Sequence, residues 1–137
     1  MDCIFCKIVK GEIPSYKVYE NEKVLAFLDI NPANYGHVLV IPKEHYNNIL
    51  DVEEDDLIEI TKAVKKIAEI LAILLEPDGI NILQSNNPAA GQVINHIHFH
   101  IIPRFVNDKV TFHWEPNKLE KKQFEELAKR LKEELEN

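Results

Sequence analysis

Three histidines spaced two residues apart are the side chains best suited to chemistry. His96, His98 and His100 alternate with apolar residues in the segment His-Ile-His-Phe-His-Ile-Ile. Successive side chains of a β-strand point to opposite faces, so residues 93–102, predicted as a strand, place the imidazoles on one side, about 6.6 Å apart. The apolar residues then enter the core. Strict alternation in an apolar run favours a functional site over a solvated face.

Two kinds of chemistry suit such a row of imidazoles. Alternating histidines can ligate zinc or a redox metal. Alternatively, one neutral imidazole can attack phosphorus or carbon while its neighbours manage protons and charge. An ordinary histidine pKa of about 6.5 leaves the ring mostly neutral, and so nucleophilic, at pH 7. The residues alone leave both chemistries open.

Two cysteines, Cys3 and Cys6, form a second motif. They have three interpretations. They are free thiols, or a redox pair, which requires a strand–helix setting that this segment does not supply. Otherwise they form half of a tetrahedral zinc site, which needs two more ligands, most readily histidines.

The elements that position these residues follow from hydrophobic patterning. Two short strands are expected within residues 16–29, around a polar turn at 20–22. Residues 37–41 form a buried strand that ends at Pro42, and residues 80–83 form another short strand.

Two helices are expected between and after these strands. Asp51 and Glu54 resemble a capping box, and apolar residues three and four apart continue to Leu74. A second amphipathic helix is expected from Asn117 onward, and it packs either on its own sheet or on a partner subunit. The order predicts an α+β fold: an antiparallel sheet of about five strands with a central helix and a C-terminal helix.

Composition narrows the classes of protein. A chain of 137 residues, 45% hydrophobic, is expected to form a single domain, 1–137. A net charge of -7 argues against a nucleic-acid partner, and no apolar stretch is long enough for a membrane span. Residues 1–5 lack the pattern of a secretory signal, and two cysteines do not suggest a disulfide scaffold. We therefore expect a cytoplasmic protein.

Residues 96–102 match the signature of the histidine-triad (HIT) family, His-φ-His-φ-His-φ-φ with φ apolar, at all seven positions. Further similar segments are Cys3-Ile4-Phe5-Cys6, residues 27–30, Pro32, residues 36–37, residues 40–45, residues 90–93 and residues 103–104. The chain resembles the Hint-like branch over roughly residues 3–104. The resemblance implies a HIT-like core over 3–104 with a helical extension over 117–136, and an enzyme acting on purine nucleotides.

The resemblance assigns catalytic roles to His96, His98, His100 and His37. His98 is the expected nucleophile, which attacks an α-phosphate to form a covalent nucleotidyl-histidine that water then hydrolyses to a nucleoside monophosphate. His100 holds a phosphate oxygen, one histidine of the site protonates the departing amine, and His37 orients the nucleophilic ring.

The resemblance also implies residues that bind the nucleotide. Asp29 accepts hydrogen bonds from the ribose hydroxyls, a role that suits a carboxylate. Phe27, Leu28 and Ile30 line the pocket for base and sugar.

A phosphate-binding loop is expected before the triad, built on backbone N–H groups of Gly91, Gln92 and Val93. Val93 stands where a hydroxyl residue is common, so a side-chain contact is lost. Ser85, where Asn is usual, and Asn86 are ambiguous ligands of phosphate or ribose. Asn87 stands where Gly is frequent, and Asn tolerates a positive φ, so the turn is expected to survive.

A structural zinc ion and a homodimer are further implications of the resemblance. The implied zinc ligands are Cys3, Cys6, His45 and His96, a closed set without an open position for substrate. The segment around Trp114 loosely resembles one that reaches the partner's site in the Hint-like branch. Alternatively, Trp114 packs against the last helix.

The leading hypothesis is a hydrolase that cleaves the P–N bond of purine nucleoside 5′-phosphoramidates. Within the same chemistry, the alternative is a dinucleoside polyphosphate hydrolase. A metalloenzyme in which His96, His98 and His100 share a catalytic metal is a second class. A nucleotide-binding adaptor dimer with little turnover is a third.

Overall fold

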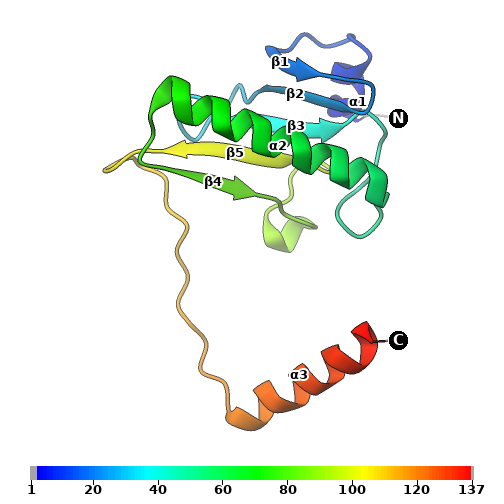
Figure 1. Cartoon of the computed structure of the whole chain (residues 1–137), viewed down its shortest axis with the longest axis vertical. Coiled ribbons are helices and arrows are strands. Elements are labelled where there is room, and N and C mark those ends of the chain that lie inside the picture. The colour runs from blue at the N-terminus through cyan, green and yellow to red at the C-terminus, as the bar shows by residue number, and fades with distance from the viewer. Residues whose placement is uncertain (1–2, 137) are drawn as a thin grey trace.

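A five-stranded antiparallel sheet forms the centre of the computed structural model, as the sequence predicted (Figure 1). The strand order is β1-β2-β3-β5-β4. The structure describes residues 3–136, so Met1, Asp2 and Asn137 of the predicted 1–137 domain lie outside the described residues. The strands are β1 (Lys17–Glu20), β2 (Val24–Leu28), β3 (Val38–Pro42), β4 (Gly79–Leu83) and β5 (Phe99–Arg104).

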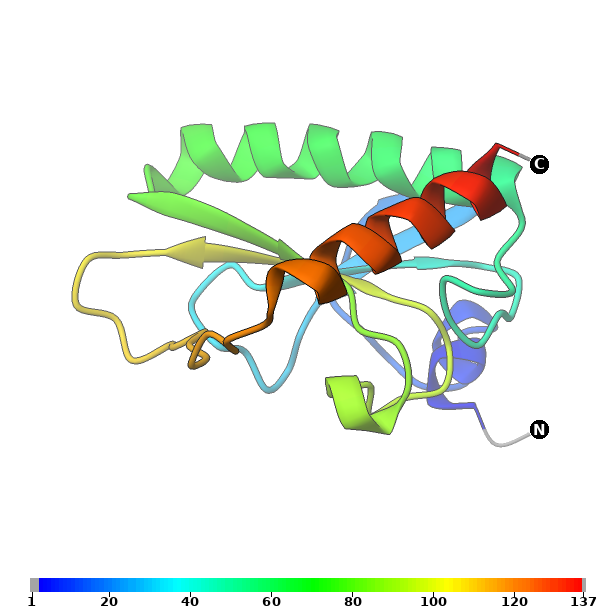
Figure 2. The same cartoon turned by 90° about the horizontal axis from the view of Figure 1, so that it is seen from below.

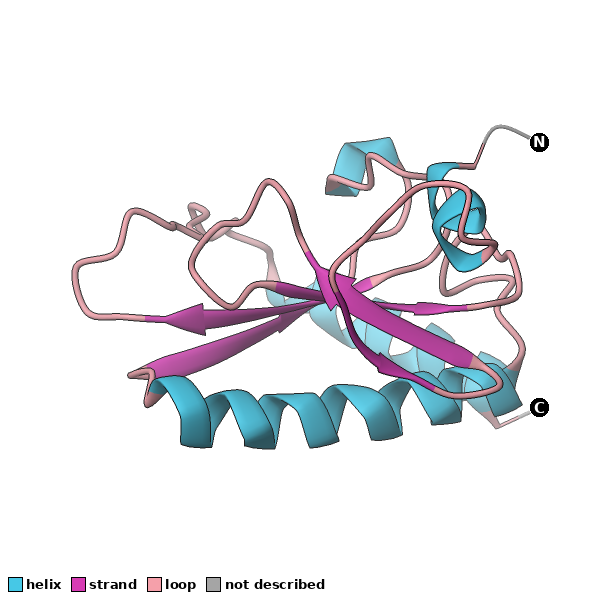
Figure 3. Cartoon of the chain, turned by 90° about the horizontal axis from the view of Figure 1, so that it is seen from above, coloured by secondary structure: helices cyan, strands magenta, loops and turns pink. Residues whose placement is uncertain are grey.

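Two hydrophobic cores cover the two faces of the sheet. On β2, Val24 and Ala26 face the long helix α2 (Glu54–Leu75), whereas Leu25 and Phe27 face the short helix α1 (Ile4–Val9). The period of two along a strand sends alternate residues into different cores, which is why β2 and β3 are apolar at nearly every position. Figure 3 shows α2 along one face and α1 with most of the loops on the other.

The helix α2 begins later than the capping-box prediction required. Glu53 is the N-cap and makes no side-chain cap bond, whereas the Asp51 carboxylate accepts from the backbone N–H groups of Asn47 and Asn48. A carboxylate that caps a preceding turn cannot also cap the helix, so the predicted capping box was wrong. Three acidic residues in the first turn still match the helix dipole.

The helix α1 was not predicted. Its six residues are too few to show helical periodicity. Cys3 caps it, because its Sγ accepts a hydrogen bond from the Cys6 backbone N–H. Phe5 and Ile8 are buried, so α1 covers the second core and holds both cysteines against the sheet.

The histidine segment is less regular than the predicted strand 93–102. β5 begins only at Phe99, because upstream groups bond elsewhere: the Ile97 N–H donates to the Tyr46 carbonyl. The side chains still alternate between the two faces although residues 96–98 do not pair as a strand. Ile97 and Ile101 are fully buried, whereas the rings of His96 and His98 both contact Phe5. The prediction of one imidazole side is therefore confirmed, with a shorter strand.

The C-terminal helix α3 (Lys121–Leu135) begins four residues after the expected start at Asn117. Glu120 and Gln123 form its capping box. Residues 110–120 form no helix or strand and carry α3 away from the sheet, past the β4 edge (Figures 1 and 2). None of its residues is buried. Within residues 3–136, no helix has both the length and the apolar character that crossing a bilayer requires.

Candidate functional site

Two groups of potentially reactive side chains lie on the α1 side of the sheet. The first, which we call the imidazole cluster, consists of Asp29, His37, His98 and His100. The second, which we call the cysteine cluster, consists of Cys3, Cys6, His45 and His96. The predicted histidines and cysteines are therefore brought together, in two groups.

Sheet pairing assembles the imidazole cluster from distant parts of the chain. β2 pairs with β3, so Asp29 at the end of one lies beside His37 at the start of the other, and the Asp29 N–H donates to the His37 carbonyl at 3.0 Å. β3 pairs with β5, with Leu39 opposite His100. Gly36, just before His37, has φ +91° and lets α2 pack closely on this turn, since a Cβ there would lie 2.5 Å from a Leu75 methyl carbon.

Hydrogen bonds fix the tautomers of His37 and His100. The Ala33 N–H donates to His37 Nδ1 at 2.9 Å, so the proton of a neutral His37 is on Nε2. That Nε2–H donates to His100 Nδ1 at 2.9 Å, and Asp29 Oδ2 lies 3.6 Å from the same Nε2. The proton of His100 is therefore on Nε2, available to a ligand.

His98 has the opposite arrangement. Its Nδ1–H donates to the His96 carbonyl at 2.7 Å, which leaves Nε2 with a lone pair. The ring lies between aromatic neighbours, with centroids 5.2 Å from Phe5 and 5.0 Å from His100. The central imidazole is thus neither surrounded by aliphatic groups nor part of a metal-type cluster.

Burial keeps these imidazoles neutral at pH 7. It lowers the pKa of His98 and of His37 below 6.5, and the pKa of His100 to about 4. The Asp29 carboxylate opposes the effect on each ring, but less strongly than burial lowers the pKa. Neutral imidazoles allow one ring, His98, to act as a nucleophile beside a neutral N–H donor on another, His100.

The cysteine cluster has the donor set and dimensions of a closed tetrahedral zinc site. Cys3 Sγ lies 3.3 Å from His96 Nδ1, and Cys6 Sγ lies 3.3 Å from His45 Nδ1 and 3.6 Å from His96 Nδ1. Tetrahedral ligation with ordinary Zn–S and Zn–N bonds separates sulfur and nitrogen by about 3.6 Å. All four ligand atoms lie within 4.8 Å of one another.

The ring of His96 belongs to the cysteine cluster. Its Nε2–H donates to the Pro42 carbonyl at 2.9 Å, which leaves the Nδ1 lone pair directed at the cysteines. A backbone acceptor on the far nitrogen is the usual support of a metal-ligating histidine. Burial, with a contribution from Cys3, raises the pKa of Cys6 to about 11, so a metal ion must displace its proton.

The residues predicted to line the base and sugar pocket are separated in the structure. Phe27 is buried against Phe5, with ring centroids 5.5 Å apart. Ile30 is 75% exposed beside the site, whereas Leu28 is on the opposite side of its strand and borders a groove along α2. Asp29 Oδ1 accepts from the Asn31 N–H at 2.8 Å, so the carboxylate is held at the edge of the cluster.

The side chains of Asn86 and Gln92 support the predicted phosphate loop from within. The Gln92 amide donates to the carbonyls of Asn47 and Ile94, and the Asn86 oxygen accepts from the Ile49 N–H. Both amides therefore join the loop to residues 47–50.

The loop backbone is also largely bonded internally. The N–H groups of Gly91 and Gln92 donate to Pro88 and Asn87 carbonyls, while Val93 is 91% exposed. Ser85 is half-buried, and its carbonyl accepts from the Gln84 amide. Asn87 has φ +73°, so the expectation that asparagine tolerates this turn is confirmed.

Three groups that organise the site were not identified from the sequence. Phe5 touches both His96 and His98, the Ala33 N–H sets the His37 tautomer, and the Pro42 carbonyl sets that of His96. The last two are backbone groups, for which residue type gives no signal. Phe5 is a bulky apolar residue between two candidate ligands, a signal that was available.

Comparisons with known proteins agree with this geometry. A family model described as HIT domain matches residues 10–107. An uncharacterised HIT-like protein of Methanocaldococcus jannaschii is 56% identical over 106 residues, which cover 77% of this chain and 81% of that protein. The adenosine 5′-monophosphoramidase of Candida albicans is 41% identical over 140 residues, with 97% of this chain and 91% of that protein covered.

Solved structures show the same fold. A HIT family member from Bacillus subtilis has a TM-score of 0.91 at 40% identity, covering 97% of this chain and 96% of that one. A zinc-bound histidine triad family protein from Mycobacterium smegmatis has a TM-score of 0.77 at 38% identity, covering 85% of each chain.

Proposed function

The chain belongs to the HIT family, and from that premise we propose that it is a hydrolase cleaving the P–N bond of purine nucleoside 5′-phosphoramidates through a covalent nucleotidyl-His98 intermediate. One observation carries the proposal: the hydrogen bonds leave a lone pair on His98 Nε2 beside a proton on His100 Nε2. A nucleophile and a hydrogen-bond donor then face one phosphorus centre. The similar C. albicans protein bears the name of this activity.

In the first step, His98 Nε2 bonds to the α-phosphorus and the P–N electron pair leaves with nitrogen. His100 Nε2–H donates a hydrogen bond to a phosphate oxygen, and the departing amine takes a proton from solvent. The Nδ1–H bond to the His96 carbonyl stabilises the positive charge that develops on His98. In the second step, a water oxygen bonds to phosphorus and releases one proton to solvent, while the P–Nε2 bond breaks and its electron pair returns to His98.

We propose the nucleotide contacts that the family resemblance implies. Asp29 accepts the ribose hydroxyls at the edge of the imidazole cluster, with Phe27 and Ile30 beside the base. The Val93 backbone faces the phosphate, and Ser85 borders the same loop. Gln92 and Asn86 hold that loop in place through their amides.

We also propose that the cysteine cluster holds a structural zinc ion. The two thiolates and two imidazoles fit a tetrahedral ion, and the similar M. smegmatis protein is zinc-bound. Such an ion supplies cross-linking rather than catalysis, because all four positions are protein ligands. It joins α1 to His45 after β3 and to His96 before β5, and homodimerisation is the further expectation from the family.

The proposal is tested by quenching the protein early in its reaction with an adenosine 5′-phosphoramidate labelled at the α-phosphorus. We expect acid-labile label on denatured protein, carried by the peptide that contains His98, and none on His98→Gly. His113→Gly is the matched control, because His113 is an exposed histidine outside both clusters. Product formation without labelled protein would exclude the covalent route. Faster initial hydrolysis of a dinucleoside polyphosphate would reassign the substrate.

A further inference from the structure

The helix α3 exposes a continuous apolar stripe. Its members recur at spacings of three and four and are all more than half exposed: Phe124, Leu127, Leu131 and Leu135. A helix of 15 residues is marginal in water, and most helices in proteins are stabilised by packing an apolar face. The stripe therefore requires a surface that one copy of the chain does not supply in this conformation.

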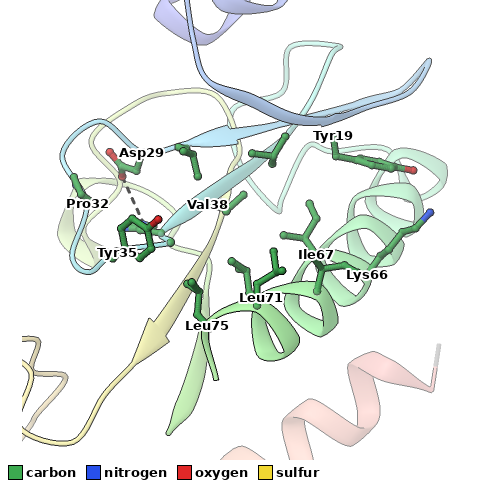
Figure 4. Close-up of a pocket in the computed structure, with 15 residues that line it drawn as sticks. Tyr19, Asp29, Pro32, Tyr35, Val38, Lys66, Ile67, Leu71 and Leu75 are labelled. Atoms are coloured by element: carbon green, nitrogen blue, oxygen red, sulfur yellow. Dashed lines mark ion pairs between the residues drawn. The ribbon is translucent and has the colours of Figure 1, made fainter. Parts of the chain in front are cut away.

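An apolar groove of about 460 Å³ lies along α2, and Asp29 and His37 of the imidazole cluster are among the residues that border it (Figure 4). We call it the α2 groove. Its walls are formed by Val18, Tyr19, Lys66, Ile70, Leu71 and Leu74. Ile70 and Leu74 are 50% and 71% exposed, although both belong to a helix whose neighbouring turns are in the core.

The arm that carries α3 leaves the molecule at the edge opposite to this groove. The groove uses β1, one edge strand, whereas the arm departs after β5 and passes the other edge strand, β4 (Figure 2). Hydrogen bonds hold the start of the arm: Arg104 binds the Asp108 carboxylate through two nitrogens, at 2.8 and 2.9 Å, and donates to Asn81 of β4. Asn34 adds a bond to Asp108 at 2.9 Å.

We propose that α3 is an exchanged arm, which seats its apolar stripe in the α2 groove of a second copy of this chain. Exchange of an identical element makes the contact reciprocal, so one two-fold axis fills both grooves and covers both stripes. The inference rests on the homodimer proposed above. It names the surface and the segment by which the two copies join.

The sizes and charges of the two surfaces match. Each large side chain of the stripe presents on the order of 100 Å² of apolar area. Two stripes of four such side chains, together with an equal area of groove that they cover, then lose roughly 1,600 Å² to the interface, the area of a standard specific interface. Lys66 supplies a cation in the groove wall, and Glu134 borders the stripe, three residues after Leu131.

Photo-crosslinking of the full chain tests the exchange directly. A benzoylphenylalanine replaces Phe124, and ¹⁵N-labelled and unlabelled copies are mixed, unfolded and refolded together before irradiation. We expect crosslinks from α3 to residues 18–19 and 66–74 that join one heavy and one light peptide. The same photo-crosslinker at Lys129, on the opposite side of α3, is the control and should not reach the groove. Groove crosslinks within single copies only, or none in the groove, would overturn the proposal.

Sedimentation of two charge-matched variants gives an independent measure. Leu131→Glu places a carboxylate in the stripe and should weaken dimerisation at least tenfold, whereas Lys129→Gln makes the same change in charge on the far side and should leave it unchanged. Ile70→Glu should act like Leu131→Glu from the groove side. Equal dimerisation of all three variants would refute exchange. Labelling of His98 is followed in parallel, so loss of the dimer with covalent labelling intact separates this inference from the proposed function.

Discussion

The imidazole cluster and the cysteine cluster are built from the same short segment, yet their histidines are prepared for opposite tasks. In the cysteine cluster, His96 donates Nε2–H to a backbone carbonyl and turns Nδ1 to two thiols. In the imidazole cluster, His98 donates Nδ1–H to a backbone carbonyl and keeps Nε2 free. In each histidine, one ring nitrogen is hydrogen-bonded to a backbone carbonyl, and the other nitrogen remains available for chemistry.

One residue connects the two clusters. The ring of His96 belongs to the cysteine cluster, while its carbonyl orients His98. The role of each histidine is therefore set by the backbone carbonyl that accepts its N–H and by the groups around its other nitrogen. These groups are thiols in the cysteine cluster and other imidazoles in the imidazole cluster. The difference also suggests a division of labour: the cysteine cluster fixes the backbone on which the nucleophile depends. The following changes test this division.

His98→Ala should have the largest effect. Without the nucleophile, we expect phosphoramidate hydrolysis to fall at least about 10³-fold, because the covalent route is lost. Zinc content, measured by metal analysis, should remain that of the unmodified chain, since the cysteine cluster is untouched. Loss of metal together with activity would show that the clusters are not separable in this way.

Cys6→Ser is the reciprocal change, and its main effect should be on stability. A zinc ion that binds only the folded state contributes about 4 kcal/mol when free zinc is a thousand times its Kd. We expect stoichiometric zinc to be lost and the Tm to fall, with kcat of the remaining folded protein changed only a few-fold. Denaturant unfolding with and without a chelator measures this. A chelator that stops turnover without lowering stability would point to a catalytic metal instead.

His37→Gln should have an intermediate effect inside the imidazole cluster. The variant keeps an amide near His100 but loses the ring that accepts from the Ala33 N–H and donates to His100. We expect a 10- to 100-fold decrease in kcat, since positioned proton transfer contributes factors of this order. Early label on His98 should still form. A variant with unchanged kcat would remove His37 from the mechanism.

The dependence of stability on pH should show the smallest effect. Burial lowers the folded-state pKa of His100 to about 4 from 6.5, so between these values the unfolded chain binds more protons than the folded one. The free energy of unfolding should therefore fall as pH decreases from about 6.5 towards 4. His100→Asn should flatten that dependence in urea titrations, and an equally steep decline would assign it to other groups.

Hydrophobic patterning predicted the sheet but not the elements at its margins. The two-sided apolar strands β2 and β3 and the long helix α2 were recognisable, because each repeats its pattern over several residues. The start of α2, by contrast, depends on which backbone groups the Asp51 side chain binds, and these lie upstream in an irregular turn. Helix α1 has too few residues to repeat any pattern, although it covers a core and carries the cysteines.

The sequence by itself determined that three imidazoles share one side, because the two-residue period and the burial of Ile97 and Ile101 require it even where no strand ladder forms. The sequence also showed that Cys3 and Cys6 are two sulfur side chains able to bind a metal ion. The residue types alone did not decide which histidine serves which cluster; the family resemblance implied it, and the tertiary structure gives the physical reason. That choice depends on hydrogen bonds to backbone groups of Ala33, Pro42 and His96, whose positions come from folding and not from residue type.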